Sequence, residues 1–163
     1  MKNTCLVLLL TAISFGAVAQ KNSSKFSIGV EAGLPIGENG DQYSSIIGGS
    51  LQYENMPASD MGITLNAGYL HYMRKSSLGG GSIGFVPLLA GVKYYFSPSP
   101  RAFFHAQLGA AFGTNSGQGT SFAYSPGIGI HLNPNIDAEL KYMGISNKGG
   151  TLDNVGLRVG FNF

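Results

Sequence analysis

The stretch that decides the fold is the last one, residues 153–163, which reads DNVGLRVGFNF. Every second side chain from Val155 onward is apolar: Val155, Leu157, Val159, Phe161 and Phe163. The residues between them are asparagine, glycine and Arg158. Strict alternation over this length predicts a β-strand with one apolar face and one polar face.

The same alternation recurs in earlier parts of the chain, and no helical periodicity longer than one turn follows Gln20. The earlier stretches are 26–34, 47–54, 61–69, 86–96, 103–112, 122–132 and 136–143. Eight strands of roughly ten residues each match the smallest closed barrels that cross a membrane. The sequence therefore predicts an all-β fold, a closed antiparallel eight-stranded transmembrane β-barrel in up-and-down meander order.

The charged residues indicate which face of each strand points outward. None lies on an apolar face of the predicted strands. Glu54 lies on a polar face at the end of its strand, and so do Glu31, Lys93, Asp137, Glu139, Lys141 and Arg158 in theirs. A register slip of one residue would turn all of them toward lipid. Because a Lys or Arg at mid-membrane costs about 2–4 kcal/mol, we expect the apolar faces to meet lipid and the charges to lie inside the barrel.

Residues 1–19 have the form of a cleaved signal peptide, and residues 20–163 then form the barrel domain. Met1-Lys2-Asn3 gives a short positive start, an apolar run follows, and Ala17-Val18-Ala19 has the small-x-small form read by signal peptidase. Cleavage would remove Cys5, the one cysteine. Charged residues make up 11% of the chain and the net charge is +2, which gives no argument for a nucleic-acid partner.

The connections between the predicted strands alternate in kind. Three are short and carry proline, at 55–59, 97–100 and 133–135, and four are longer and polar, at 37–43, 74–82, 113–121 and 146–151. In outer-membrane barrels short turns face the periplasm and longer loops face outward, so both termini are expected on the periplasmic side. Pro35, Pro87 and Pro126 fall within strands and are expected near the outer rim, where strand pairing frays.

With these features the chain resembles the OmpA-barrel and OmpX-like superfamily of small outer-membrane β-barrels, in particular the Bacteroidetes-type barrel-domain proteins. The alternating strands, the turn–loop alternation and the ending Phe161-Asn162-Phe163 carry the resemblance. It implies the outer membrane of a Gram-negative bacterium, contact with outer-membrane lipid and lipopolysaccharide, and recognition by the barrel-assembly machinery through Phe161 and Phe163. The superfamily includes adhesins, structural barrels and a few enzymes. For this chain we expect a structural or surface-interaction role through the outer loops, with no catalysis and no cofactor.

Three other functions are weighed against that role. One is a small-solute channel, and another is a soluble carrier of lipocalin type, which would place the apolar faces inside. The third is an enzyme, because residues 142–147 followed by 154–163 resemble the end of lipid A deacylase barrels. The motif of those enzymes carries a histidine two positions before the nucleophilic serine. Here that position is Gly144, so the base is missing, and Asp153 is the one downstream carboxylate.

The first group of candidate site residues is a row inside the barrel. Hairpin arithmetic places Lys93 opposite His105, His105 opposite His131, and His131 opposite Asp137. Such a row could handle a metal or protons, or it could be a hydrogen-bonded plug. We favour the plug and assign no metal, because buried polar groups in a narrow lumen must find partners.

The second group is Glu31, Glu139, Lys141 and Arg158. Closure of the barrel would let Arg158 reach Glu31 across the seam and Glu139 diagonally. The group could be a selectivity ring of a pore or a network that fills the lumen. Because unpaired buried charge is costly, we favour the filled lumen.

Overall fold

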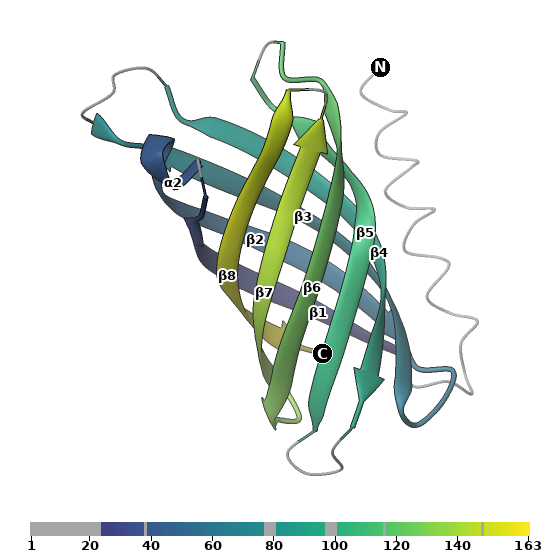
Figure 1. The fold of residues 1–163 in the computed structure, drawn as a ribbon. Helices are drawn as coiled ribbons and strands as arrows, with labels where there is room; N and C mark the ends of the chain where they lie inside the picture. The colour runs from purple at the N-terminus through teal and green to yellow at the C-terminus, as the bar shows by residue number, and fades with distance from the viewer. Residues whose placement is uncertain (1–23, 38, 77–80, 97–100, 116, 148) are drawn as a thin grey trace, which may run out of the picture.

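The chain folds into a closed barrel in which each strand pairs antiparallel with the next and β8 pairs with β1 (Figure 1). The computed structural model describes residues 24–37, 39–76, 81–96, 101–115, 117–147 and 149–163. The strands are β1 (Ser24–Pro35), β2 (Tyr43–Asn55), β3 (Met61–Arg74), β4 (Ile83–Tyr95), β5 (Ala102–Gly113), β6 (Thr120–Asn133), β7 (Ile136–Asn147) and β8 (Gly150–Asn162). The predicted fold class is confirmed, whereas the signal-peptide prediction lies outside the described residues.

Helix contributes little to the described part of the chain. The short helix α2 (Asn39–Gln42) lies in the connection between β1 and β2 (Figure 1). No helix among the described residues is long and apolar enough to cross a membrane.

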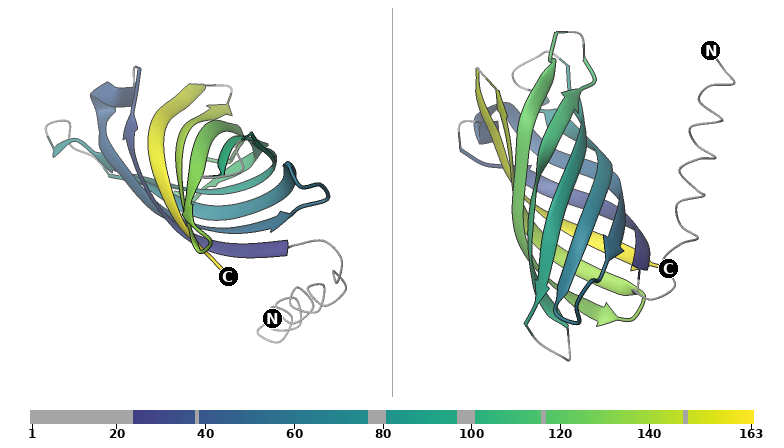
Figure 2. Two further views of the ribbon diagram at one scale, coloured as in Figure 1. Left: turned by 90° about the horizontal axis from the view of Figure 1, so that it is seen from below. Right: turned by 90° about the vertical axis from the view of Figure 1, so that its right-hand side faces the viewer.

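The seam between the first and last strands is fully paired. Val30 faces Val159, and Glu31 faces Arg158. The backbone NH of Phe163 donates to the carbonyl of Phe26 at 2.8 Å, so the chain end continues the pairing beyond β8. Figure 2 shows the closed wall from two further directions. Closure leaves no long strand edge to pair with another chain.

The two faces of each strand have the expected environments. Outward side chains are apolar and exposed on the isolated chain, such as Val30 at 68% and Leu108 at 61%. The charged residues predicted to point inward are all buried. The inverted arrangement of a lipocalin-type carrier is therefore wrong for this chain.

The connections follow the predicted alternation in part. The β1–β2 and β3–β4 connections, with seven and eight residues, are the longest, whereas the β4–β5 and β5–β6 connections have six residues each. The β1–β2, β3–β4, β5–β6 and β7–β8 connections lie at the same end of the barrel. The β7–β8 connection comprises only residues 148 and 149, because both strands extend further than predicted. It is as short as the β6–β7 turn at residues 134 and 135. We call the end of the barrel that carries the β1–β2, β3–β4, β5–β6 and β7–β8 connections the loop end, and the opposite end the turn end.

Extension of β8 to Gly150 changes the environment of one acidic residue. Asp153 lies three positions inside the strand and shares the outward face with Val155 and Leu157. The expectation that no charge lies on an apolar face is therefore wrong at Asp153.

Pro126 also departs from expectation, because it lies in the middle of β6 and not near the rim. Proline has no backbone NH to donate, and the pairing of β6 with β7 is interrupted there. The neighbouring Ser125 hydroxyl donates to the carbonyl of Tyr142 at 2.8 Å. The carbonyl of Tyr142, which faces the proline, therefore has a hydrogen-bond donor although β6 offers no backbone NH there.

Candidate functional site

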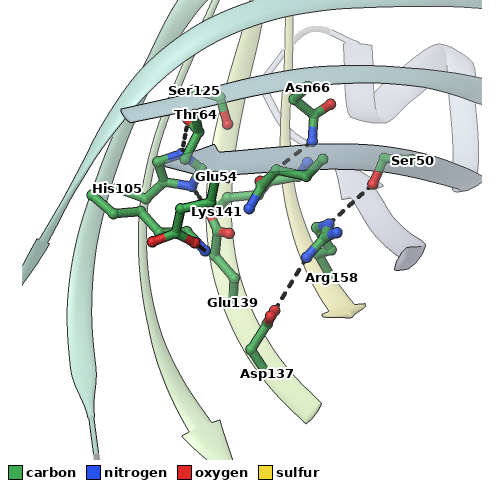
Figure 3. A network of polar contacts seen from close by, with 12 residues as sticks. Ser50, Glu54, Thr64, Asn66, His105, Ser125, Asp137, Glu139, Lys141 and Arg158 are labelled. Carbon is green, nitrogen blue, oxygen red and sulfur yellow. Dashed lines mark hydrogen bonds and ion pairs between the residues drawn. The ribbon is translucent and has the colours of Figure 1, made fainter. Parts of the chain in front are cut away.

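The interior of the barrel carries the candidate site, and its turn-side half is held by ion pairs (Figure 3). Four pairs join inward side chains: Lys93–Glu54, His105–Glu139, Lys141–Glu31 and Arg158–Asp137, at 3.1, 3.0, 2.7 and 3.1 Å. Every member is buried. We call these eight residues, with Thr64, Tyr95 and His131, the polar network.

Lys93 on β4 reaches Glu54 on β2 across the intervening strand. Gly62 of β3 lies opposite Lys93, and a Cβ atom there would fall 3.1 Å from Cδ of Glu54. The glycine therefore leaves the space that the carboxylate occupies. The hydroxyl of Tyr95 donates a second hydrogen bond to Glu54, and the Lys93 ammonium lies 4.4 Å from the ring centroid of Phe103.

His131 connects to this group through Tyr95. The two rings stack with centroids 5.8 Å apart and an interplanar angle of 17°, and Nε2 of His131 lies 3.4 Å from the Tyr95 oxygen. Because Tyr95 gives its one proton to Glu54, Nε2 of His131 must be the donor in this contact.

His105 bridges strands on opposite sides of its own. Its Nε2 lies 2.9 Å from the Thr64 hydroxyl on β3, and its Nδ1 lies 3.0 Å from Oε1 of Glu139 on β7. The second contact passes over β6, where Gly127 stands opposite His105. A Cβ atom at Gly127 would lie 2.8 Å from Oε1 of Glu139, so this glycine also makes room for the network.

Arg158 binds groups on three other strands. Its Nε donates to Ser50 at 3.0 Å, its Nη2 to Ser27 at 2.7 Å, and its Nη1 to Asp137 at 3.1 Å (Figure 3). The second oxygen of Asp137 accepts from Asn162 at 2.9 Å. The guanidinium and its counter-ion are thus both hydrogen-bonded beyond the ion pair, which a buried pair requires to offset desolvation.

Some predicted contacts are present and others are wrong. Lys93 stands opposite His105 and His131 opposite Asp137, as expected. His105, however, stands opposite Gly127 and not His131, because β5 and β6 pair four positions away from the expected register. The continuous row of four residues is therefore absent.

The second predicted group is also rearranged. Arg158 stands directly opposite both Glu31 and Glu139, but its guanidinium binds Asp137. Glu31 instead binds Lys141, and Glu139 binds His105. The two predicted groups are therefore parts of one network.

Sequence reasoning missed Glu54, although it placed that residue on an inward face. The signal was Gly62, which leaves Lys93 without a facing side chain on β3 and opens the path to β2. It also missed the hydroxyl partners Ser27, Ser50 and Thr64, which carry no charge to mark them.

The loop-side half of the interior is apolar, which the sequence reading did not predict. The residues of this apolar layer are Tyr43, Ile46, Leu70, Tyr72, Phe85, Leu89, Ala111, Ala123, Met143 and Ile145. The Tyr72 and Phe85 rings meet edge to face at 5.7 Å between centroids. The Tyr72 oxygen accepts from Nδ2 of Asn154 at 2.8 Å, so its polar end is satisfied within the layer.

Little space remains where the two halves meet. A cavity of about 10 Å³ lies there, bordered by Glu31 and Lys141 on the polar side and by Ile46, Leu70 and Met143 on the apolar side. A volume of this size is at the lower limit for a single water molecule.

Neither a metal centre nor the deacylase motif is assembled among the described residues. No group of three or more His, Cys, Asp or Glu side chains there is placed to hold a metal ion. Ser146 points outward and accepts a hydrogen bond from the Thr151 hydroxyl at 3.1 Å. Gly144 stands between Tyr124 and Asp153 on the outward face.

The comparisons with known proteins concern the whole barrel. A family model described as "outer membrane protein beta-barrel domain" matches residues 5–163. No curated protein matches the chain.

Several solved structures are similar to it in fold. The attachment invasion locus protein Ail of Yersinia pestis is 20% identical with a TM-score of 0.63, covering 88% of this chain and 100% of that one. The N-terminal β-barrel domain of Pseudomonas aeruginosa OprF is 20% identical with a TM-score of 0.56, covering 88% and 100%. A de novo designed transmembrane β-barrel is 15% identical with a TM-score of 0.57, covering 88% and 98%. At these identities the likeness concerns the fold.

Proposed function

Because the chain belongs to the outer membrane protein β-barrel domain family, we propose that it is a non-conducting barrel of the Gram-negative outer membrane with a structural or surface-interaction role. The observation that supports this proposal is the packing of inward side chains. Ion pairs occupy the turn-side half, apolar rings occupy the loop-side half, and the cavity between them holds about 10 Å³. A small-solute channel needs a continuous hydrated path, which this packing disfavours.

We place the loop end outside the cell and both termini in the periplasm, as in outer-membrane barrels with short periplasmic turns. Residues 1–19 would direct export as a cleaved signal peptide. Phe161 and Phe163 would present the terminal strand to the barrel-assembly machinery. Their rings contact each other edge to face at 5.1 Å between centroids and are exposed on the outward face.

The loop end has features that suit contact with a partner. The Asn115 side chain accepts from the NH of Gly84 at 3.2 Å and donates to the carbonyl of Ser82 at 3.3 Å. These bonds tie the β5–β6 loop to the beginning of β4. A loop that is held before binding loses less conformational entropy on binding. We assign no catalytic role, because Ser146 has Gly144 where a deacylase has its histidine.

Conductance of the full chain tests the closed interior. The refolded protein is inserted into planar lipid bilayers, with a general porin as the positive control for the assay. We expect no stable unitary steps, because neither half of the interior leaves a water-filled path. Reproducible steps of one size from the refolded protein would instead establish the channel function.

A further inference from the structure

The outward face of the barrel carries one acidic side chain within a described strand, and its surroundings form a site. Asp153 lies three positions from the start of β8 at the loop end. An outward charge costs much less near the membrane interface than at the midplane. At this depth the carboxylate faces lipid headgroups and not acyl chains.

Three aromatic rings lie side by side next to Asp153. Phe122 and Tyr124 on β6 stack with centroids 6.1 Å apart and an interplanar angle of 27°. Tyr124 and Tyr142 on β7 follow at 5.9 Å and 39°. Phe122 is 54% exposed on the outward face. The rings form a ring platform, defined as Phe122, Tyr124 and Tyr142, that ends at the carboxylate.

The polar ends of the platform are connected to Asp153. The Tyr142 hydroxyl donates to Oδ1 of Asp153, and the Tyr124 hydroxyl lies 3.5 Å from that of Tyr142. Asp153 therefore remains an acceptor with a fixed orientation. One described partner for a carboxylate leaves most of its acceptor capacity available to a donor from outside.

Gly144 keeps the site open and positions the rings. It stands between Tyr124 and Asp153 in the same cross-strand row. A Cβ atom there would lie 2.6 Å from the Tyr124 hydroxyl oxygen, so any other residue would displace the ring. The glycine thus allows Tyr124 to lie flat over β7, toward the carboxylate.

We propose that the ring platform and Asp153 bind the saccharide headgroup of an outer-leaflet glycolipid. The apolar face of a sugar ring packs on aromatic rings, and its hydroxyls donate hydrogen bonds to a carboxylate. Asp153 would repel a phosphate group, and the site as defined contains no Lys or Arg side chain to bind one. The hydroxyl-bearing part of the headgroup is therefore the part recognised. The inference rests on the proposed orientation, in which the loop end meets the outer leaflet.

Tryptophan fluorescence can report on this site, because the chain has no tryptophan. A Phe122→Trp reporter is placed in phospholipid vesicles that contain increasing fractions of rough lipopolysaccharide. We expect a saturable change in emission. Asp153→Asn in the reporter background should weaken the apparent affinity roughly tenfold or more, because the sugar hydroxyls lose a charged acceptor. Tyr142→Phe, which releases the carboxylate from its donor, should also weaken it.

Two matched controls accompany the titration. Ile47→Trp places the reporter on the outward face of β2, away from β6, β7 and β8, and should give no saturable change. Asp60→Asn removes an exposed carboxylate at the turn end and should leave the affinity unchanged. Equal affinity in the Asp153→Asn and reference proteins would overturn the proposal. Loss of binding on chelation of divalent cations would also overturn it, because a cation would then bridge Asp153 to phosphate.

Orientation is measured separately, so that the two proposals can fail independently. Thr114→Cys at the loop end should react with an impermeant thiol reagent on intact cells, and Ser59→Cys at the turn end should not. The reverse labelling would reject the orientation together with the glycolipid site. Correct labelling with an unaffected Asp153→Asn protein would reject the glycolipid site alone.

Discussion

The two halves of the barrel interior are filled by different chemistry. On the turn side, three ion pairs and the hydrogen bond between His105 and Glu139 join side chains from different strands at 2.7 to 3.1 Å. On the loop side, apolar rings and alkyl chains fill the same cross-section. Apolar packing tolerates exchange of side chains at constant volume, whereas a buried charge tolerates no loss of its partner. We therefore expect the polar half to constrain which strands pair, and the apolar half to be the more tolerant of substitution.

The largest expected effect is in the polar half, from Arg158→Met. The substitution keeps an unbranched side chain but leaves Asp137 buried without its cation. We expect the free energy of unfolding to fall by about 3–5 kcal/mol, measured by urea titration of the folded protein in detergent micelles. Arg101→Met is the matched control, because Arg101 lies half-buried at the turn end and its loss should change stability by less than about 1 kcal/mol. Equal losses in the two proteins would contradict the distinction.

A smaller effect is expected where a glycine admits the network. In Gly62→Ala the new methyl group would meet Glu54 and push its carboxylate from Lys93. Overpacking of this kind costs about 1–3 kcal/mol, to be read from the same titration. Gly81→Ala is the control, since nothing lies within 4 Å of a Cβ atom there. If the Gly62→Ala protein were as stable as the Gly81→Ala protein, the ion pair between Lys93 and Glu54 across β3 would not depend on the glycine.

The smallest effect is expected in the apolar half, from Tyr72→Phe. The ring and its packing against Phe85 remain, and only the hydrogen bond from Asn154 is lost. Asn154 keeps its bond to the carbonyl of Met143 at 3.3 Å, so the loss should be about 0.5–1.5 kcal/mol. Tyr94→Phe, on an exposed outward ring, should be neutral. A Tyr72→Phe loss as large as that of Arg158→Met would show that the apolar half also depends on specific polar partners.

The sequence predicts the faces of the strands better than their registers. Alternation decides which side of the sheet a residue occupies, and for this reason Lys93, Glu139 and Arg158 were placed inside correctly. A shift by an even number of residues preserves both faces, so alternation cannot detect it. The β5–β6 pairing shows this. His105 stands opposite Gly127 where His131 was predicted, and it still faces the barrel interior. The turn of that hairpin uses Gly117 and Gly119 at positive φ, a geometry that its residue types did not reveal.

The apolar layer escaped prediction for a related reason. Near the loop end Met143 and Ile145 face inward, and the outward residue between them is Gly144. Where inward residues are also apolar, the assignment of apolar side chains to the outward face no longer distinguishes the two faces of a strand. Asp153 was misjudged in the same region, because the last strand begins before its alternation becomes recognisable.

The placement of Arg158 has a consequence for how the barrel is made. Asp137 lies on the adjacent strand and is within reach in an unclosed sheet. Ser27 on β1 and Ser50 on β2 come within reach of Arg158 only when β1 pairs with β8. An eight-stranded sheet that has not yet closed would hold a half-coordinated guanidinium in a hydrated trough. Closing the seam supplies both missing acceptors and expels that water at once. Closure of the barrel is then cooperative with formation of these hydrogen bonds. A sheet that closed in the wrong register would lack the bonds from Arg158 to Ser27 and Ser50 that stabilise the seam.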